Sequence, residues 1–76
     1  MKIQDILNQS KPCWQYAATD KDGKIYFYSA KPRICDNLWS CADVCDSAER
    51  IDHIFDIEPF DGDWKNSLIS REGYRL

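Results

Sequence analysis

The stretch that decides the fold is CWQYAATDKDGKIYFYS, residues 13–29. Two aromatic, strand-prone runs flank Asp22-Gly23, a pair that accepts the positive φ angles of a tight turn, so the pattern predicts a β-hairpin. A three-residue loop with a bulge at Gly23 would shift the pairing register by one. A two-residue loop sorts the large apolar residues better. It places the expected core side chains on one face: Trp14, Tyr16, Ala18, Ile25 and Phe27.

Further elements are expected on both sides of this hairpin. Ile3, Ile6 and Leu7 have helical spacing, so residues 1–12 are expected to be a helical or flexible segment, with the helix over 2–9. Apolar residues alternate with mostly acidic ones over 50–58, which predicts a strand. The expected strands of the sheet are 13–19, 24–30 and 50–58. A fourth strand over 37–41 is one of two interpretations, and a helical turn that brings Leu38, Cys41 and Cys45 to one face is the other.

The C-terminal part of the chain is predicted to form a short helix over 64–71. Asp63 can cap its first turn, and Trp64 and Leu68 are neighbours on one helical face. Together these elements predict an α+β, mainly β fold in a single small domain, residues 1–76, with its core in 13–72. Its antiparallel sheet has three to four strands, and the short C-terminal helix packs through Trp64 and Leu68.

The cysteines are compatible with a zinc site, but their spacing does not indicate one. Zinc modules usually supply their ligands as C-x2-C pairs, whereas the intervals here are 21, 5 and 3 intervening residues. Buried thiols that pack as small apolar groups explain the same residues. His53 is expected on the apolar face of the 50–58 strand. We therefore expect no metal and keep one alternative set of zinc ligands: Cys13, Cys35, Cys41, Cys45 and His53.

Charge is distributed unevenly along the chain. Residues 36–63 contain nine acids and one base, which gives this segment a charge of −8, although the whole chain carries only −3. Such a segment either is a solvated surface or binds a basic partner. Uncharged stretches are too short to span a membrane. The first ten residues lack a signal-peptide pattern, so a cytoplasmic protein with thiols is expected.

The order of several short motifs resembles a loose group of small proteins from tailed bacteriophages and prophages. The shared pattern is W…DxDG…KP…DWxxSL, carried here by Trp14, residues 20–23, residues 31–32 and residues 63–68. The resemblance spans about residues 13 to 71. It implies an accessory or early-region phage protein in a bacterial cytoplasm, and it implies no catalytic residues because the group has no known function.

The sequence thus leads to one hypothesis and one alternative. The hypothesis is a non-enzymatic phage protein, without catalytic residues or cofactors, that binds a host protein with a basic surface and inhibits a defence or nucleic-acid enzyme. Neither a membrane nor nucleic acid is expected as a partner, and the oligomeric state is open. The alternative is a zinc-stapled adaptor or nucleic-acid-binding module. The expected partner-binding residues are Asp43, Asp46, Asp52, Asp56 and Glu58.

Overall fold

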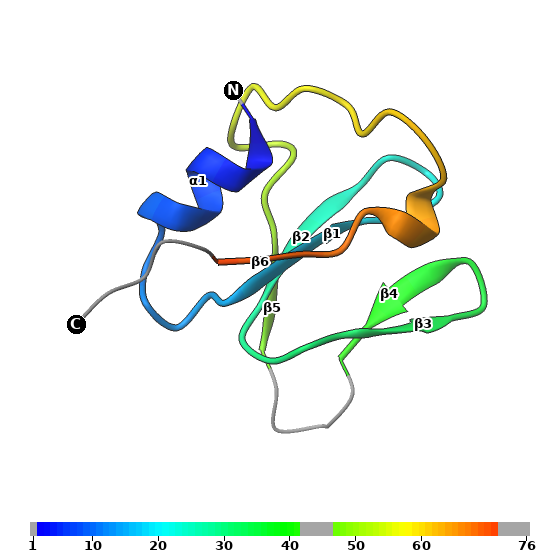
Figure 1. Cartoon of the computed structure of the whole chain (residues 1–76), viewed down its shortest axis with the longest axis horizontal. Helices are drawn as coiled ribbons and strands as arrows, with labels where there is room; N and C mark the ends of the chain where they lie inside the picture. The colour runs from blue at the N-terminus through cyan, green and yellow to red at the C-terminus, as the bar shows by residue number, and fades with distance from the viewer. Residues whose placement is uncertain (1, 42–46, 72–76) are drawn as a thin grey trace.

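The computed structural model describes residues 2–41 and 47–71, and this part of the chain is mostly β (Figure 1). Four strands form the main antiparallel sheet in the order β5-β2-β1-β6. A second antiparallel sheet contains only β3 and β4. The strands are β1 Tyr16–Thr19, β2 Ile25–Tyr28, β3 Arg33–Cys35, β4 Leu38–Ser40, β5 Ala48–Arg50 and β6 Ile69–Ser70. One helix, α1 (Ile3–Gln9), and one 3-10 turn, η1 (Trp64–Asn66), complete the fold.

The main sheet has an apolar cluster on each face. On one face, Ile6 and Leu7 of α1 pack with Ala17, Phe27 and other buried residues of the sheet. On the opposite face, Trp39 of β4 packs with Ala18 and Tyr28. Figure 1 shows α1 and the β3–β4 hairpin on opposite sides of the sheet. The fold therefore has three layers around two small clusters, because successive strand residues point to opposite faces.

The β1–β2 hairpin confirms the predicted elements but not the predicted register. Ala17 pairs with Phe27 and Thr19 pairs with Ile25, which is one residue away from the expected alignment. The loop has three residues and closes with Gly23 N–H donating to Asp20 O at 2.9 Å, while Gly23 has a φ of +92°. The prediction was wrong because it assumed one apolar face, whereas both faces of this hairpin are buried.

The strand expected over 50–58 is wrong after its first residue. β5 ends at Arg50, and the next residues form a turn in which Ile54 N–H and Phe55 N–H both donate to Ile51 O. The turn thereby removes that carbonyl from the sheet. Ile25 N–H of β2 donates instead to the Asp52 carboxylate at 3.0 Å. A side chain thus replaces the main-chain acceptor at the point where β5 leaves the sheet.

The C-terminal helix expected over 64–71 is also wrong. The 3-10 turn η1 ends after Asn66, and Ile69 then pairs with Ala17 on the open edge of β1. Trp64 and Leu68 nevertheless both pack against the cluster of Ala18, Tyr28 and Trp39, as the helical spacing predicted. The sheet edge competes with the helix for these residues because it satisfies their backbone groups equally well.

The fold class must therefore be corrected from an α+β domain with one sheet to a mostly β domain with two. The strand expected over 37–41 exists as β4, but it pairs with the unexpected strand β3 rather than with the main sheet. The N-terminal helix is confirmed as α1. Its last turn is held by Arg71, whose guanidinium donates to the carbonyl oxygens of Asn8 and Ser10 at 2.9 and 3.0 Å.

Candidate functional site

The candidate site is the segment 52–63, called here the acidic loop, which connects β5 to η1. It runs across the top of the molecule in Figure 1 and contains no helix or strand. Loops longer than about 12–15 residues without secondary structure are uncommon in compact domains and are usually functional or disordered, and this segment lies at the lower end of that range. Its chain is held at both ends: the turn after Ile51 starts it, and Asp63 ends it by accepting a hydrogen bond from Lys65 N–H at 3.1 Å.

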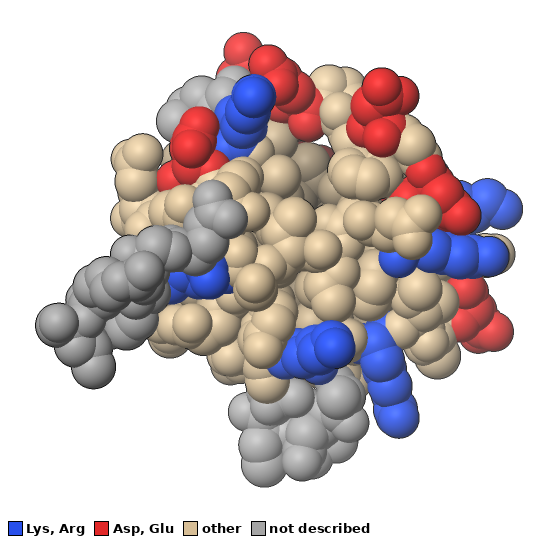
Figure 2. Space-filling view, in the orientation of Figure 1, with Lys and Arg blue, Asp and Glu red and all other residues tan. Residues whose placement is uncertain are grey.

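Exposed acidic and exposed apolar side chains alternate irregularly along the acidic loop. The exposed acids are Asp56, Glu58, Asp61 and Asp63. Between them, Ile54 is 55% exposed, Phe55 38% and Phe60 39%. Figure 2 shows acidic side chains along the upper edge of this face, where the loop runs, with a basic side chain among them, while charges of both signs lie along the right edge. Exposed apolar side chains that adjoin one another, as Ile54 and Phe55 do, are typical of contact surfaces when polar residues surround them.

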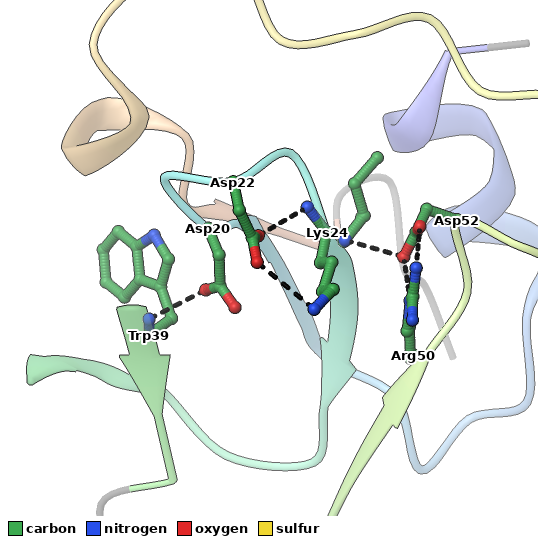
Figure 3. Close-up of polar contacts among 7 residues, drawn as sticks. Asp20, Asp22, Lys24, Trp39, Arg50 and Asp52 are labelled. Atoms are coloured by element: carbon green, nitrogen blue, oxygen red, sulfur yellow. Dashed lines mark hydrogen bonds and ion pairs between the residues drawn. The ribbon is translucent and has the colours of Figure 1, made fainter. Parts of the chain in front are cut away.

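Asp52 does not belong to this exposed surface. Its carboxylate accepts two hydrogen bonds from the Arg50 guanidinium, both at 2.9 Å, and also the bond from Ile25 N–H (Figure 3). The Arg50 side chain, followed by the Ile25 N–H, lowers the pKa of Asp52 to about 2. Asp52 therefore stabilises the β2–β5 junction, and its expected role in partner binding stays a prediction.

The other expected partner-binding residues fall into two groups. Asp56 and Glu58 are exposed on the acidic loop, as a binding role requires. Asp43 and Asp46 lie outside the described residues. The acidic loop also exposes Asp61, which belongs to the acidic segment 36–63 but was not among the expected partner-binding residues. Its position next to the exposed Phe60 could not be read from charge alone.

Sequence reasoning also missed the role of Asp20. This residue is only 8% exposed, and its carboxylate accepts a hydrogen bond from Trp39 N–H at 2.8 Å (Figure 3). Burial raises the pKa of Asp20, although the Trp39 hydrogen bond opposes the change. The bond ties the β1–β2 turn to β4. The D-x-D-G motif did not indicate this contact, because a tight turn by itself accounts for both of its aspartates.

The cysteines and the histidine do not occupy the expected places. Cys13 and Cys35 are exposed free thiols, and Cys41 is a half-buried one. His53 is exposed in the turn after β5, so its expected position on an apolar strand face is wrong. Cys45 lies outside the described residues. Within residues 2–41 and 47–71, no three metal-ligating side chains come together.

An apolar groove adjoins the start of the acidic loop. It has a volume of about 440 Å³ and lies between the end of α1 and β5. Trp14 and Phe27, whose ring centroids are 6.2 Å apart, line it together with Ile51. Ile54 and Phe55 of the acidic loop line it as well. The groove offers apolar contact surface beside the charged loop, and binding is the chemistry that this arrangement supports.

The described residues contain no helix long and apolar enough to cross a membrane. Comparison of the chain with family models, with curated proteins and with solved structures found no match.

Proposed function

We propose that this chain is a small non-enzymatic binding protein that contacts a partner protein with a basic surface through the acidic loop. The observation that carries the proposal is the exposure of Ile54, Phe55 and Phe60 among Asp56, Glu58 and Asp61. Apolar side chains in such a surface supply contact area, while the acids steer a basic partner and select against acidic ones.

The way in which acids are used elsewhere in the fold supports this proposal. Asp20 and Asp52 accept backbone hydrogen bonds, and Asp22 forms an ion pair with Lys24 at 3.3 Å. Glu58 and Asp61 have neither kind of contact in the described part of the chain. Their charges are therefore available to a partner, and they lie on the segment that also exposes aromatic rings.

The resemblance to small phage and prophage proteins supplies the setting of the proposal. In that setting the partner is a bacterial host protein, and the effect of binding is inhibition of a defence or nucleic-acid enzyme. A basic surface that normally holds nucleic-acid phosphates fits the acidic loop electrostatically. An 8.9 kDa chain would act by covering such a surface.

The test compares two charge reversals in a tagged pull-down from a bacterial lysate. Asp61→Lys changes the acidic loop, and Asp5→Lys makes the same change of charge at an exposed position on α1. We expect wild type and Asp5→Lys to retain one stoichiometric basic protein, which a salt step releases, and Asp61→Lys to lose it. Equal retention by both variants, or binding that is insensitive to salt, would refute the acidic-loop mechanism.

A further inference from the structure

The outer edge of β5 carries main-chain groups that are not paired with the sheet. Ile51 N–H donates to Ile25 O and Ser29 N–H donates to Ser47 O, so hydrogen-bonded pairs alternate along the β2–β5 ladder. Glu49 lies between these two pairs and is the residue of β5 whose main chain faces Phe27. The N–H and C=O groups of Ala48 and Arg50 therefore point away from the sheet, and β5 is its last strand.

The same edge borders the apolar groove. Glu49 and Ile51 line it, and both side chains project from β5 towards the α1 face of the sheet. Beyond Ile51, the exposed side chains of Ile54 and Phe55 also line the groove. An extended chain added to β5 would thus place every second side chain beside Glu49 or in the groove.

We propose that the β5 edge and the adjoining groove bind an extended segment of the partner by adding it to the sheet as an antiparallel strand. This inference rests on the proposed function and names the partner's recognition element. Main-chain hydrogen bonds to Ala48 and Arg50 hold the segment, and its side chains select it. The residue opposite Glu49 is basic, and the residue two positions before it is large and apolar and fills the groove beside Ile51.

A second copy of this chain is a poorer occupant of the same edge. A symmetric antiparallel pairing that uses the outward groups of both Ala48 and Arg50 is centred on Glu49. It would place the two Glu49 side chains directly opposite each other, where cross-strand like charges are destabilising. The same position favours a basic residue from a different chain. Glu49 therefore selects a basic partner segment over self-association through this strand.

The test uses the full chain and synthetic peptides, with binding measured by isothermal titration calorimetry. The reference peptide is acetyl-Thr-Val-Thr-Phe-Thr-Lys-Thr-amide, and the control has the same composition with Phe and Lys adjacent. We expect the reference peptide to bind and the control to bind at least about tenfold more weakly, because its Phe and Lys project to opposite faces. Equal affinities would overturn the proposal.

Two further experiments separate strand addition from simple charge attraction. Glu49→Lys is expected to weaken the reference peptide by about two- to fivefold and to prefer the peptide with Glu in place of Lys. Ala48→Pro removes one outward N–H, a change that edge strands tolerate, and is expected to weaken every peptide. N-methylation of the peptide amides provides the same test without altering the protein. Only the amides facing β5 should be sensitive, and uniform tolerance would overturn the proposal.

The two proposals fail in different ways. If the peptides do not bind, while a basic lysate protein is still retained and lost in Asp61→Lys, then only the strand-addition proposal is wrong. If the reference peptide binds and Asp61→Lys retains the lysate protein unchanged, then the acidic-loop mechanism is wrong and the β5 edge stands alone.

Discussion

Replacement of Asp52 provides the sharpest test of how the acidic segment is used. Its carboxylate accepts hydrogen bonds from Ile25 N–H and from the Arg50 guanidinium. Asp52→Ala removes both acceptors and leaves the N–H of Ile25, a residue that is 4% exposed, without a partner. An unsatisfied buried donor costs about 1–3 kcal/mol. Asp52→Asn keeps one amide oxygen for Ile25 and loses mainly the charge.

The two variants are therefore expected to differ in the free energy of unfolding. Asp52→Asn should cost less than about 1 kcal/mol, because the Arg50 side chain is 41% exposed and solvent weakens the ion pair. Asp52→Ala should cost about 2–3 kcal/mol, which in a domain of this size lowers Tm by roughly 10–20 °C. Urea and thermal unfolding followed by tryptophan fluorescence measure both. Equal stability of the two variants would refute the backbone-acceptor role.

The same pair gives a pH dependence whose sign follows from the pKa. The folded-state pKa of Asp52 is about 2, below the ordinary value of 3.8. The charge of Asp52 therefore stabilises the fold above about pH 4, and this contribution is lost as the pH falls towards 2. The stability difference between wild type and Asp52→Asn should shrink over that range. A difference that grows as the pH falls would contradict the assigned ion pair.

Three further changes test contacts that hold the layers together, each measured by urea unfolding. Gly23→Ala meets no atom within 4 Å, so its expected loss of about 1–2 kcal/mol comes from the positive φ of +92° alone; an unchanged midpoint would mean that the loop relaxes. Ser67→Ala removes the hydroxyl that accepts from Thr19 N–H at 2.8 Å and should cost about 1–3 kcal/mol; a smaller loss would show that water replaces it. Arg71→Lys should cost about 1–2 kcal/mol, because an ammonium cannot reach the spread carbonyls that the guanidinium fork binds; wild-type stability would contradict that role.

Local patterns predicted the elements whose signals lie within a few residues. Helical spacing at Ile3, Ile6 and Leu7 predicted α1, and aromatic runs around Asp22-Gly23 predicted the β1–β2 hairpin. Both could be predicted from the sequence because short-range turn and periodicity rules decide them. The length of the β1–β2 loop could not be predicted, since it depended on whether one or both faces of the sheet would be covered.

Three other elements depended on a competition between backbone partners, which lie near in the sequence for β3 and β5 and far away for β6. β6 forms because β1 offers an open edge to Ile69, which is more than 50 residues away. β5 stops because the turn at 51–55 takes the Ile51 carbonyl. β3 becomes a strand only by pairing with β4. Each local segment was compatible with another structure, and the competition was decided by which backbone groups found acceptors.

The candidate site divides in the same way. The sequence by itself determined that residues 36–63 carry a charge of −8 and that no motif marks a catalytic centre. Only the tertiary structure decided that Asp52 serves the sheet while Glu58 and Asp61 stand exposed beside Phe60. Charge is a property of each residue and can be counted along the chain. Whether a carboxylate accepts a hydrogen bond from a buried N–H or remains available to a partner depends on which strand ends beside it.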